Sequence, residues 1–351
     1  MKLGDGLGVR SARTWLPATV ETTAQALAAG RITSRDVEET GGTEVPVSQA
    51  LAAPEMAVLA AKDALDAAGW APGELDITAH AWIHHQGHDF WSPAHYVASR
   101  LGAVAAVPVG VQAMCNGGAL ALEMAAARLL ADPDTHTALV TTGDRFADEG
   151  FDRWSGDYGV FYGDGATAVL LHRRDDAADE LTLLGIATAA ISHAETLHRG
   201  RDPFSPTSRW HSDRVDVKRT KKAHIEDIGL TAFYDGAGAA LRTVVEVGLT
   251  QSGLDHDDPR VRLIALPRVG ASVRRETYHP AVVGLTKAEI VDLGATTGHL
   301  GAGDLGANLT AIVAGGLLAP GEIALVISAG GGFSFSCAVV RRPHHRAESS
   351  T

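Results

Sequence analysis

The sequence predicts an α/β fold built from two similar halves. Apolar segments with the pattern of strands alternate along the chain with segments that have the 3.6-residue periodicity of helices. This alternation is typical of sheets whose faces are covered by helices. Each half contains a strand, a helix, another strand, a second helix and a closing strand. We therefore expect one structural unit to occur twice, in residues 1–175 and 176–351.

The individual elements follow from the same patterns. In the first half we expect helices over residues 48–68, 93–101 and 117–130, and strands over residues 75–83, 105–111, 137–142 and 167–171. In the second half we expect strands over residues 181–190, 261–266, 323–328 and 334–341, and helices over residues 223–247, 286–293 and 307–315. Three glycines, at 229, 236 and 238, could interrupt the first of those helices. Residues 199–222 are rich in charge, and we expect a long surface segment there.

Composition limits the class of protein. The 351 residues are 45% hydrophobic and 21% charged, as in globular proteins with a large core. A net charge of −12 argues against nucleic acid and anionic lipid as partners, although an acidic carrier protein would need only a local basic patch. Two cysteines, no signal-peptide pattern and no apolar run of about 18 residues together predict a cytoplasmic protein.

A single cysteine lies between an expected strand and an expected helix. Cys115 follows the apolar segment 105–111 and precedes the helix that begins near Gly117. The positive end of a helix dipole favours thiolate over thiol, so the position suits a nucleophile at neutral pH. The alternative is a small buried side chain that only contributes packing.

A second candidate is a histidine followed by an aspartate in a glycine-rich segment. His299 and Asp304 are five residues apart in residues 297–308, just before an expected helix. Such a histidine could act as a general base whose tautomer the carboxylate fixes. The alternative is an aspartate at a helix start beside an unrelated histidine.

A third candidate is the run of three glycines at 330–332, between the last two expected strands. Backbone amides presented there could form an oxyanion hole or hold a phosphate group, and a plain hairpin turn is equally consistent. The glycine spacing of dinucleotide-binding and P-loop proteins is absent.

Three further histidines, His84, His85 and His88, resemble a metal site only superficially. No fourth ligand or ordered second shell is evident near them in the sequence. We predict no metal site, and instead a loop at a pocket mouth or at a subunit contact.

The order of the three clusters resembles the thiolase-fold ketosynthases of type III, the acyl-carrier-protein synthase III family. The resemblance covers nearly the whole chain and rests on four motifs: Trp15-Leu16-Pro17, the Cys115 turn, Tyr162-Gly163-Asp164-Gly165-Ala166 and Gly330-Gly331-Gly332-Phe333. It implies a thiolase-like fold with five αβαβα layers, a homodimer, and Cys115 as the acyl-accepting nucleophile. It further implies an oxyanion hole made by the backbone amides of Cys115 and Gly331.

Two departures from the family change the expected chemistry. Condensing members use a Cys-His-Asn triad, but here Arg268 replaces the histidine and His299 replaces the asparagine. Arginine cannot act as a general base. The remaining Cys115, His299 and Asp304 resemble a Cys-His-Asp branch of acyltransferases from antibiotic and polyketide pathways. That resemblance implies acyl transfer to a hydroxyl of a deoxysugar or aglycone; the alternatives are a starter-unit ketosynthase that forms carbon–carbon bonds, and a non-enzymatic scaffold.

The sequence also bears on which residues contact the acyl donor and the substrate. Members that use coenzyme A carry an arginine after a Thr-Gly pair, and here Thr40-Gly41 has none, so an acyl-carrier protein is as plausible a donor as acyl-CoA. No permanently bound cofactor is expected. Arg268 could meet a carboxylate on a dicarboxylic acyl group or be a structural ion-pair partner. Phe90, Trp91 and Phe333 are the other expected substrate contacts, and the resemblance implies that residues 84–91 complete the partner's pocket.

Overall fold

Ten strands form one hydrogen-bonded sheet, and the two halves of the chain contribute their strands with the same topology. The computed structural model describes residues 1–173 and 178–344. The first half contributes β1 (Lys2–Trp15), β4 (Ile77–Ala81), β5 (Val107–Val111), β6 (Thr137–Asp144) and β7 (Gly165–His172). The second contributes β8 (Leu181–Ala190), β9 (Val261–Ala265), β10 (Glu289–Val291), β11 (Ile323–Gly330) and β12 (Ser334–Arg341).

The strand order is β10-β9-β11-β12-β8-β1-β7-β6-β4-β5. Counted inward from the two edges, β5 corresponds to β10, β4 to β9, β6 to β11, β7 to β12 and β1 to β8. The predicted repeat of one unit is thus visible in the sheet. The predicted boundary between residues 175 and 176 lies outside the described residues and stays a prediction.

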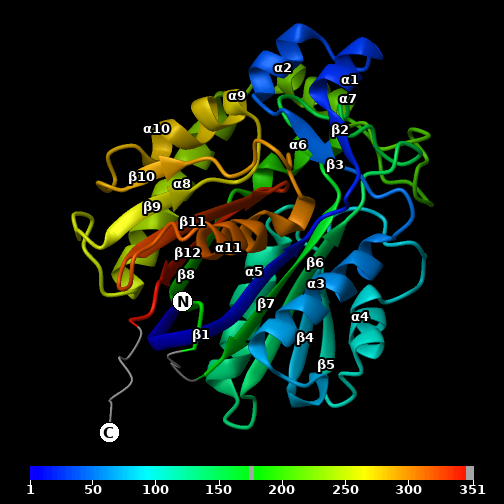
Figure 1. The fold of residues 1–351 in the computed structure, drawn as a ribbon. Helices are drawn as coiled ribbons and strands as arrows, with labels where there is room; N and C mark the ends of the chain where they lie inside the picture. The colour runs from blue at the N-terminus through cyan, green and yellow to red at the C-terminus, as the bar shows by residue number, and fades with distance from the viewer. Residues whose placement is uncertain (174–177, 345–351) are drawn as a thin grey trace, which may run out of the picture.

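Helices divide the molecule into five layers (Figure 1). Helices α3 (Ala53–Ala68) and α4 (Pro93–Leu101) cover the outer face of the first half-sheet, and α5 (Gly117–Ala131) and α11 (Asp304–Ala314) lie between the two half-sheets. Helix α8 (Thr231–Gln251), with α10 (His279–Val282) beside it, covers the second half-sheet. The predicted αβαβα arrangement is confirmed. Helix α5 is rich in alanine and leucine because both of its sides face a sheet.

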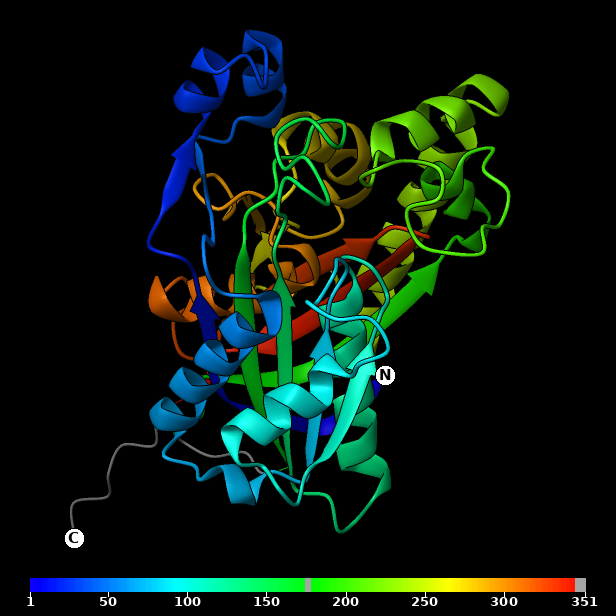
Figure 2. The same cartoon turned by 90° about the vertical axis from the view of Figure 1, so that its right-hand side faces the viewer.

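The shorter elements gather at one end of the molecule, at the top of both views (Figures 1 and 2). They are β2 (Val20–Thr22), β3 (Glu44–Pro46), α1 (Thr23–Ala28), α2 (Ser34–Thr40), α6 (Thr196–Arg199), α7 (Val217–Asp227) and α9 (Ala271–Val273). None of the helices described here has the length and apolarity needed to cross a membrane.

Three differences from the sequence prediction have physical causes. The helix expected over residues 286–293 is wrong, because Glu289–Val291 pairs with β9 as a parallel edge strand. The helix expected over 223–247 is two helices, α7 and α8, separated at Gly229, whose φ of 79° suits glycine. Strand β1 was not predicted, because its glycines at 4, 6 and 8 obscure the alternating pattern.

Candidate active site

Cys115 lies in a tight turn between β5 and α5, as the sequence predicts. The preceding residue, Met114, has φ of 52°, a conformation that is rare for a side-chain-bearing residue and is found mostly where a fold constrains a functional site. The next residue, Asn116, is fully buried and donates hydrogen bonds to the hydroxyls of Ser334 and Ser336, at 3.0 and 2.9 Å. The cysteine turn is therefore held against β12 of the other half.

The three-glycine segment lies directly against this turn. It is the hairpin between β11 and β12, and it also forms a wall of the cavity that contains Cys115. A Cβ atom on Gly330 would lie 2.3 Å from the backbone nitrogen of Asn116 and 2.9 Å from that of Cys115. Any side chain at Gly330 would push the hairpin away from Cys115. The hairpin interpretation is confirmed, and the oxyanion hole stays a prediction.

His299 and Asp304 form a buried pair. The Nδ1 atom of His299 lies 2.7 Å from Oδ2 of Asp304. The same carboxylate accepts hydrogen bonds from the backbone N–H groups of Arg268 and Leu300, at 2.8 and 2.9 Å. The ring of Tyr162 meets the imidazole edge-on, with 5.1 Å between centroids. These contacts fix the orientation of His299.

Cys115 and His299 line the same cavity, and the sulfur lies close enough to the imidazole to affect its protonation. Burial disfavours the charged form of His299, but the charges of Asp304 and Cys115 outweigh it and raise the pKa of His299 well above its ordinary value. A histidine that holds its proton beside a sulfur stabilises the thiolate, which is the reactive form of cysteine. The predicted Cys115, His299 and Asp304 are thus brought together.

The site opens into a cavity of about 440 Å³. Its walls are largely aromatic and aliphatic, and they include Val160, Tyr162, Leu197, Phe233, Tyr278, Phe333 and Phe335. Gly331, the expected second oxyanion donor, lines the same cavity as Cys115 and His299. Phe333, an expected substrate contact, also lies in the wall.

Two other expected substrate contacts are elsewhere. Phe90 is fully exposed and Trp91 is 37% exposed, and neither lines the Cys115 cavity of its own chain. The cause is local: Phe90 has φ of 50° in the loop before α4, and Trp91 packs on His88 and Tyr96. Whether this loop completes the cavity of a partner subunit stays a prediction.

Arg268 does not line the cavity, so the structure does not support the predicted contact with a carboxylate of the acyl group. Its side chain is buried and donates from Nε to Asn308 Oδ1 at 2.9 Å and from Nη1 to Thr297 Oγ1 at 2.8 Å. The guanidinium thus supports the loop that carries His299. This is a structural role, but through uncharged hydrogen-bond partners and not through the ion pair considered above.

The histidine-rich loop is held by a carboxylate that sequence reasoning missed. Asp144, at the end of β6, accepts hydrogen bonds from the backbone N–H groups of Ile83, His84 and Ala302, each at 2.9 Å. Burial raises the pKa of Asp144 to about 7. Because Ala302 belongs to the His299 loop, Asp144 ties that loop to the first half.

His84 itself packs on Phe146, and burial lowers its pKa to about 4. Within residues 1–173 and 178–344, no three His, Cys, Asp or Glu side chains are grouped so that they could hold a metal ion.

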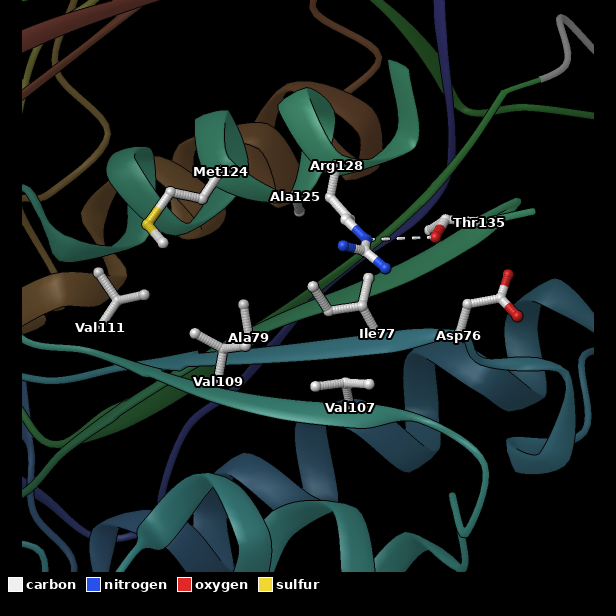
Figure 3. A pocket seen from close by; sticks show the side chains of 10 residues that line it. All are labelled: Asp76, Ile77, Ala79, Val107, Val109, Val111, Met124, Ala125, Arg128 and Thr135. Carbon is white, nitrogen blue, oxygen red and sulfur yellow. Dashed lines mark hydrogen bonds between the residues drawn. The ribbon is translucent and has the colours of Figure 1, made fainter. Parts of the chain in front are cut away.

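A second cavity, of about 280 Å³, lies between the edge strand β5 and helix α5, and its wall follows β5 from Val107 to Val111 (Figure 3). Its wall is mainly apolar, with Arg128 and Asp76 at one end, and it contains no cysteine or histidine. Val107 and Met124 in its wall are 59% and 50% exposed. This cavity lies at the edge of the sheet, and none of the candidate catalytic residues line it.

Comparisons with known proteins agree with the geometry. Residues 109–189 match the family model of 3-oxoacyl-[acyl-carrier-protein] synthase III. The β-ketoacyl-[acyl-carrier-protein] synthase III of Dinoroseobacter shibae is 26% identical over 290 residues, which are 82% of this chain and 83% of that protein. The solved structure of ChlB3, described as an acyltransferase, is 29% identical with a TM-score of 0.87, over 96% of this chain and 98% of that one.

The chain is therefore similar to the ketoacyl synthase III proteins. It has the thiolase-like fold: synthase III of Aquifex aeolicus superimposes with a TM-score of 0.75 at 20% identity, over 96% of this chain and all of that one. These likenesses indicate an enzyme of the ketoacyl synthase III or thiolase type, which transfers or condenses acyl groups.

Several polar residues of the cavity were not predicted from the sequence. Asp157, His198 and Lys221 are among them, and the last two lie on α6 and α7 at the borders of the segment that was expected to be only a surface excursion. One available signal for α7 was Asp216, a residue type typical of the position that caps the start of a helix.

Proposed function

We propose that this enzyme is an O-acyltransferase that carries the acyl group on Cys115 and delivers it to a hydroxyl. The observation that carries the proposal is the buried His299–Asp304 pair beside Cys115 in one cavity, which Arg268 does not line. This arrangement provides one nucleophile and one oriented base.

In the first half-reaction, the Cys115 thiolate attacks the carbonyl carbon of an acyl thioester. The backbone amides of Cys115 and Gly331 stabilise the oxyanion of the tetrahedral intermediate. When the intermediate collapses, the carbon–sulfur bond to the donor breaks, and the departing thiolate takes the proton from His299. The products are acyl-Cys115, a free donor thiol and a neutral imidazole.

In the second half-reaction, the acceptor hydroxyl loses its proton to neutral His299 as its oxygen attacks the acyl carbon. Collapse of this intermediate releases the ester and the Cys115 thiolate. The imidazolium and thiolate are thereby restored, so the cycle needs no resident cofactor. Asp304 holds the imidazole in the tautomer that can accept this proton.

Oxygen is favoured over carbon as the acceptor because condensation needs different residues. Decarboxylative condensation in the family depends on a histidine and an asparagine that stabilise an enolate, and this chain has Arg268 and His299 at those positions. Arg268 is permanently charged and is already hydrogen-bonded to Asn308 and Thr297. The likeness to ChlB3, described as an acyltransferase, supports the same choice.

The proposal extends to the partners. The donor is an acyl-CoA or acyl-carrier-protein thioester, and the acceptor is a hydroxyl of a deoxysugar or aglycone of a polyketide-type product. We also propose a homodimer, supported by the exposed apolar edge of β5 and α5 (Figure 3).

The test separates the two half-reactions. The protein is incubated with acyl thioesters, and intact mass spectrometry is used to detect an adduct that disappears in Cys115→Ala. The matched control is Cys337→Ala, since burial raises the pKa of Cys337 to about 12 and this thiol should not react. The acyl-enzyme is then offered either a glycosylated aglycone or malonyl-carrier protein. Ester formation supports the proposal, whereas carbon dioxide release with a β-ketoacyl product would show a condensing enzyme.

A further inference from the structure

A polar cluster interrupts the apolar wall of the Cys115 cavity. The ammonium group of Lys221 lies 2.6 Å from Oδ1 of Asp157, and the hydroxyl of Tyr162 donates to Oδ2 of Asp157 at 3.0 Å. Tyr162 in turn contacts the ring of His299. The cluster is therefore connected to the catalytic dyad and faces the same space as the reacting sulfur.

His198 is the member of this wall that lacks a partner. Its ring lies against the backbone of Gly331, where a Cβ atom would be 2.6 Å from Cε1, and its centroid is 5.4 Å from that of Phe333. Its Nδ1 atom is buried and has no hydrogen-bond partner among the described residues. A buried polar atom without a partner costs free energy. Because the imidazole itself lines the cavity, a ligand that hydrogen-bonds the ring there would offset part of this cost.

The charge balance of the wall defines the chemistry of that ligand. The pKa of Asp157 is lowered: burial acts against ionisation, and the charge and hydrogen bond of Lys221 more than offset it. Burial, and then the charge of Lys221, lower the pKa of His198 to about 4. At neutral pH the cluster around His198 thus contains one cation, one anion and a neutral imidazole. Elsewhere the cavity wall has two further cations and two further anions, Arg35, Arg275, Glu39 and Glu276. A carboxylate would compete with Asp157 for Lys221, whereas a hydroxyl can donate to or accept from the imidazole without adding charge.

We propose that His198, beside the Asp157–Lys221 pair, recognises an uncharged hydrogen-bonding substituent, such as a hydroxyl, on the acyl group that is loaded onto Cys115. This inference rests on the proposed acyl-Cys115 intermediate and adds the class of acyl group. A plain alkyl or aryl acyl group would fill the aromatic part of the cavity but leave His198 unpaired. A site built to hydrogen-bond a hydroxyl discriminates against the analogue that lacks it.

The experiment measures the first half-reaction alone, without an acceptor. Second-order rate constants of Cys115 acylation are determined by intact mass for thioesters of one short thiol. The matched acyl pairs are 3-hydroxybutanoyl with butanoyl and hydroxybenzoyl (each ring isomer) with benzoyl, and succinyl represents a carboxylate. In the unmodified protein we expect at least one hydroxylated acyl group to react about tenfold or more faster than its partner, and succinyl to react slowly.

Three variants test the role of His198. His198→Leu should lower the rate for the preferred hydroxylated acyl group to that of its deoxy partner and leave the deoxy rate nearly unchanged. His198→Gln, which keeps a hydrogen-bonding group, should retain part of the preference. His193→Leu replaces an exposed histidine on the same segment and should behave like the unmodified protein.

Two outcomes overturn the inference while leaving the acyltransferase intact. One is an adduct that forms at equal rates for both members of every pair; the other is a His198→Leu variant that slows both members equally, as expected of a merely structural residue. The absence of any adduct with every thioester would instead contradict the proposed function itself.

Discussion

The two halves of the molecule use the same strand–helix turn for different chemical purposes. In the first half, β5 leads through Cys115 to α5, and in the second half, the topologically equivalent β10 leads through His299 to α11. The first turn presents a partly exposed thiol to the cavity, and the second presents a buried imidazole held by Asp304 at the start of α11. In the proposed mechanism, the repeated unit thus supplies the nucleophile from one copy and the base from the other.

The two turns can cooperate because they touch. A Cβ atom on Gly118 would lie 2.4 Å from the backbone oxygen of Ala302, and one on Gly117 would lie 3.5 Å from the Cβ of Ala302. Glycine at the start of α5 therefore permits the close approach that brings Cys115 to His299. The comparison predicts that a change to either turn, or to the contact between them, affects the half-reactions differently.

The largest effect is expected from His299→Ala. Transfer to the acceptor should fall by roughly 10³- to 10⁴-fold, because the hydroxyl proton loses its acceptor. Some acylation of Cys115 should persist, since the N-terminus of α5 still favours the thiolate. The two rates are measured separately by intact mass and product analysis, with His95→Ala as a control for an exposed histidine. Unchanged turnover would refute the assignment of His299 as the base.

A smaller effect is expected from Asp304→Asn. Transfer should fall by roughly 10²- to 10³-fold, because the amide does not fix the required tautomer. Loss of the carboxylate also removes a charge that raises the pKa of His299. The base must be neutral for transfer, so the acidic limb of the pH–rate profile should move to lower pH. A limb that stays in place or moves to higher pH would contradict this role of Asp304.

A change at the contact between the turns should act on both half-reactions together. Gly118→Ala forces a side chain against Ala302 and should lower the free energy of unfolding by about 1–3 kcal/mol, a typical cost of overpacking. Acylation and transfer should both slow, by about tenfold. Denaturation and the two rate measurements are compared with Gly73→Ala, where the added methyl meets open space. If Gly118→Ala leaves stability and both rates unchanged, the contact does not position the site.

The smallest effect on the reaction rates is expected from Arg268→Met. The ratio of succinyl to butanoyl acylation should stay the same, because Arg268 does not line the cavity. Stability should fall by about 1–3 kcal/mol, since buried oxygens of Asn308 and Thr297 lose their donor. A selective loss of succinyl acylation would restore Arg268 as a substrate contact.

Sequence patterns identified the candidate catalytic residues better than they identified the residues that line the cavity around them. Cys115, His299 and Asp304 each occupy a strand–helix turn, which local glycine and apolar patterns reveal. Asp157, His198 and Lys221 come from loops and short helices with ordinary surface composition. The N-cap residue Asp216 marks the start of the helix that carries Lys221, but it does not mark a cavity wall. Residues 286–293 had a helical apolar spacing, yet pairing with β9 decided in favour of a strand.

The sequence by itself determined the α/β class and the repeated unit, and it singled out the candidate nucleophile and base, because periodicity and turn residues act over short distances. Only the tertiary structure decided which side chains contact one another and which of them line the cavity. It turned Arg268 toward Asn308 and away from the substrate, placed Phe90 outside the cavity of its own chain, and set His198 against Gly331. These outcomes depend on how two half-sheets pack across α5 and α11, and contacts between residues far apart in the chain leave no local pattern in the sequence.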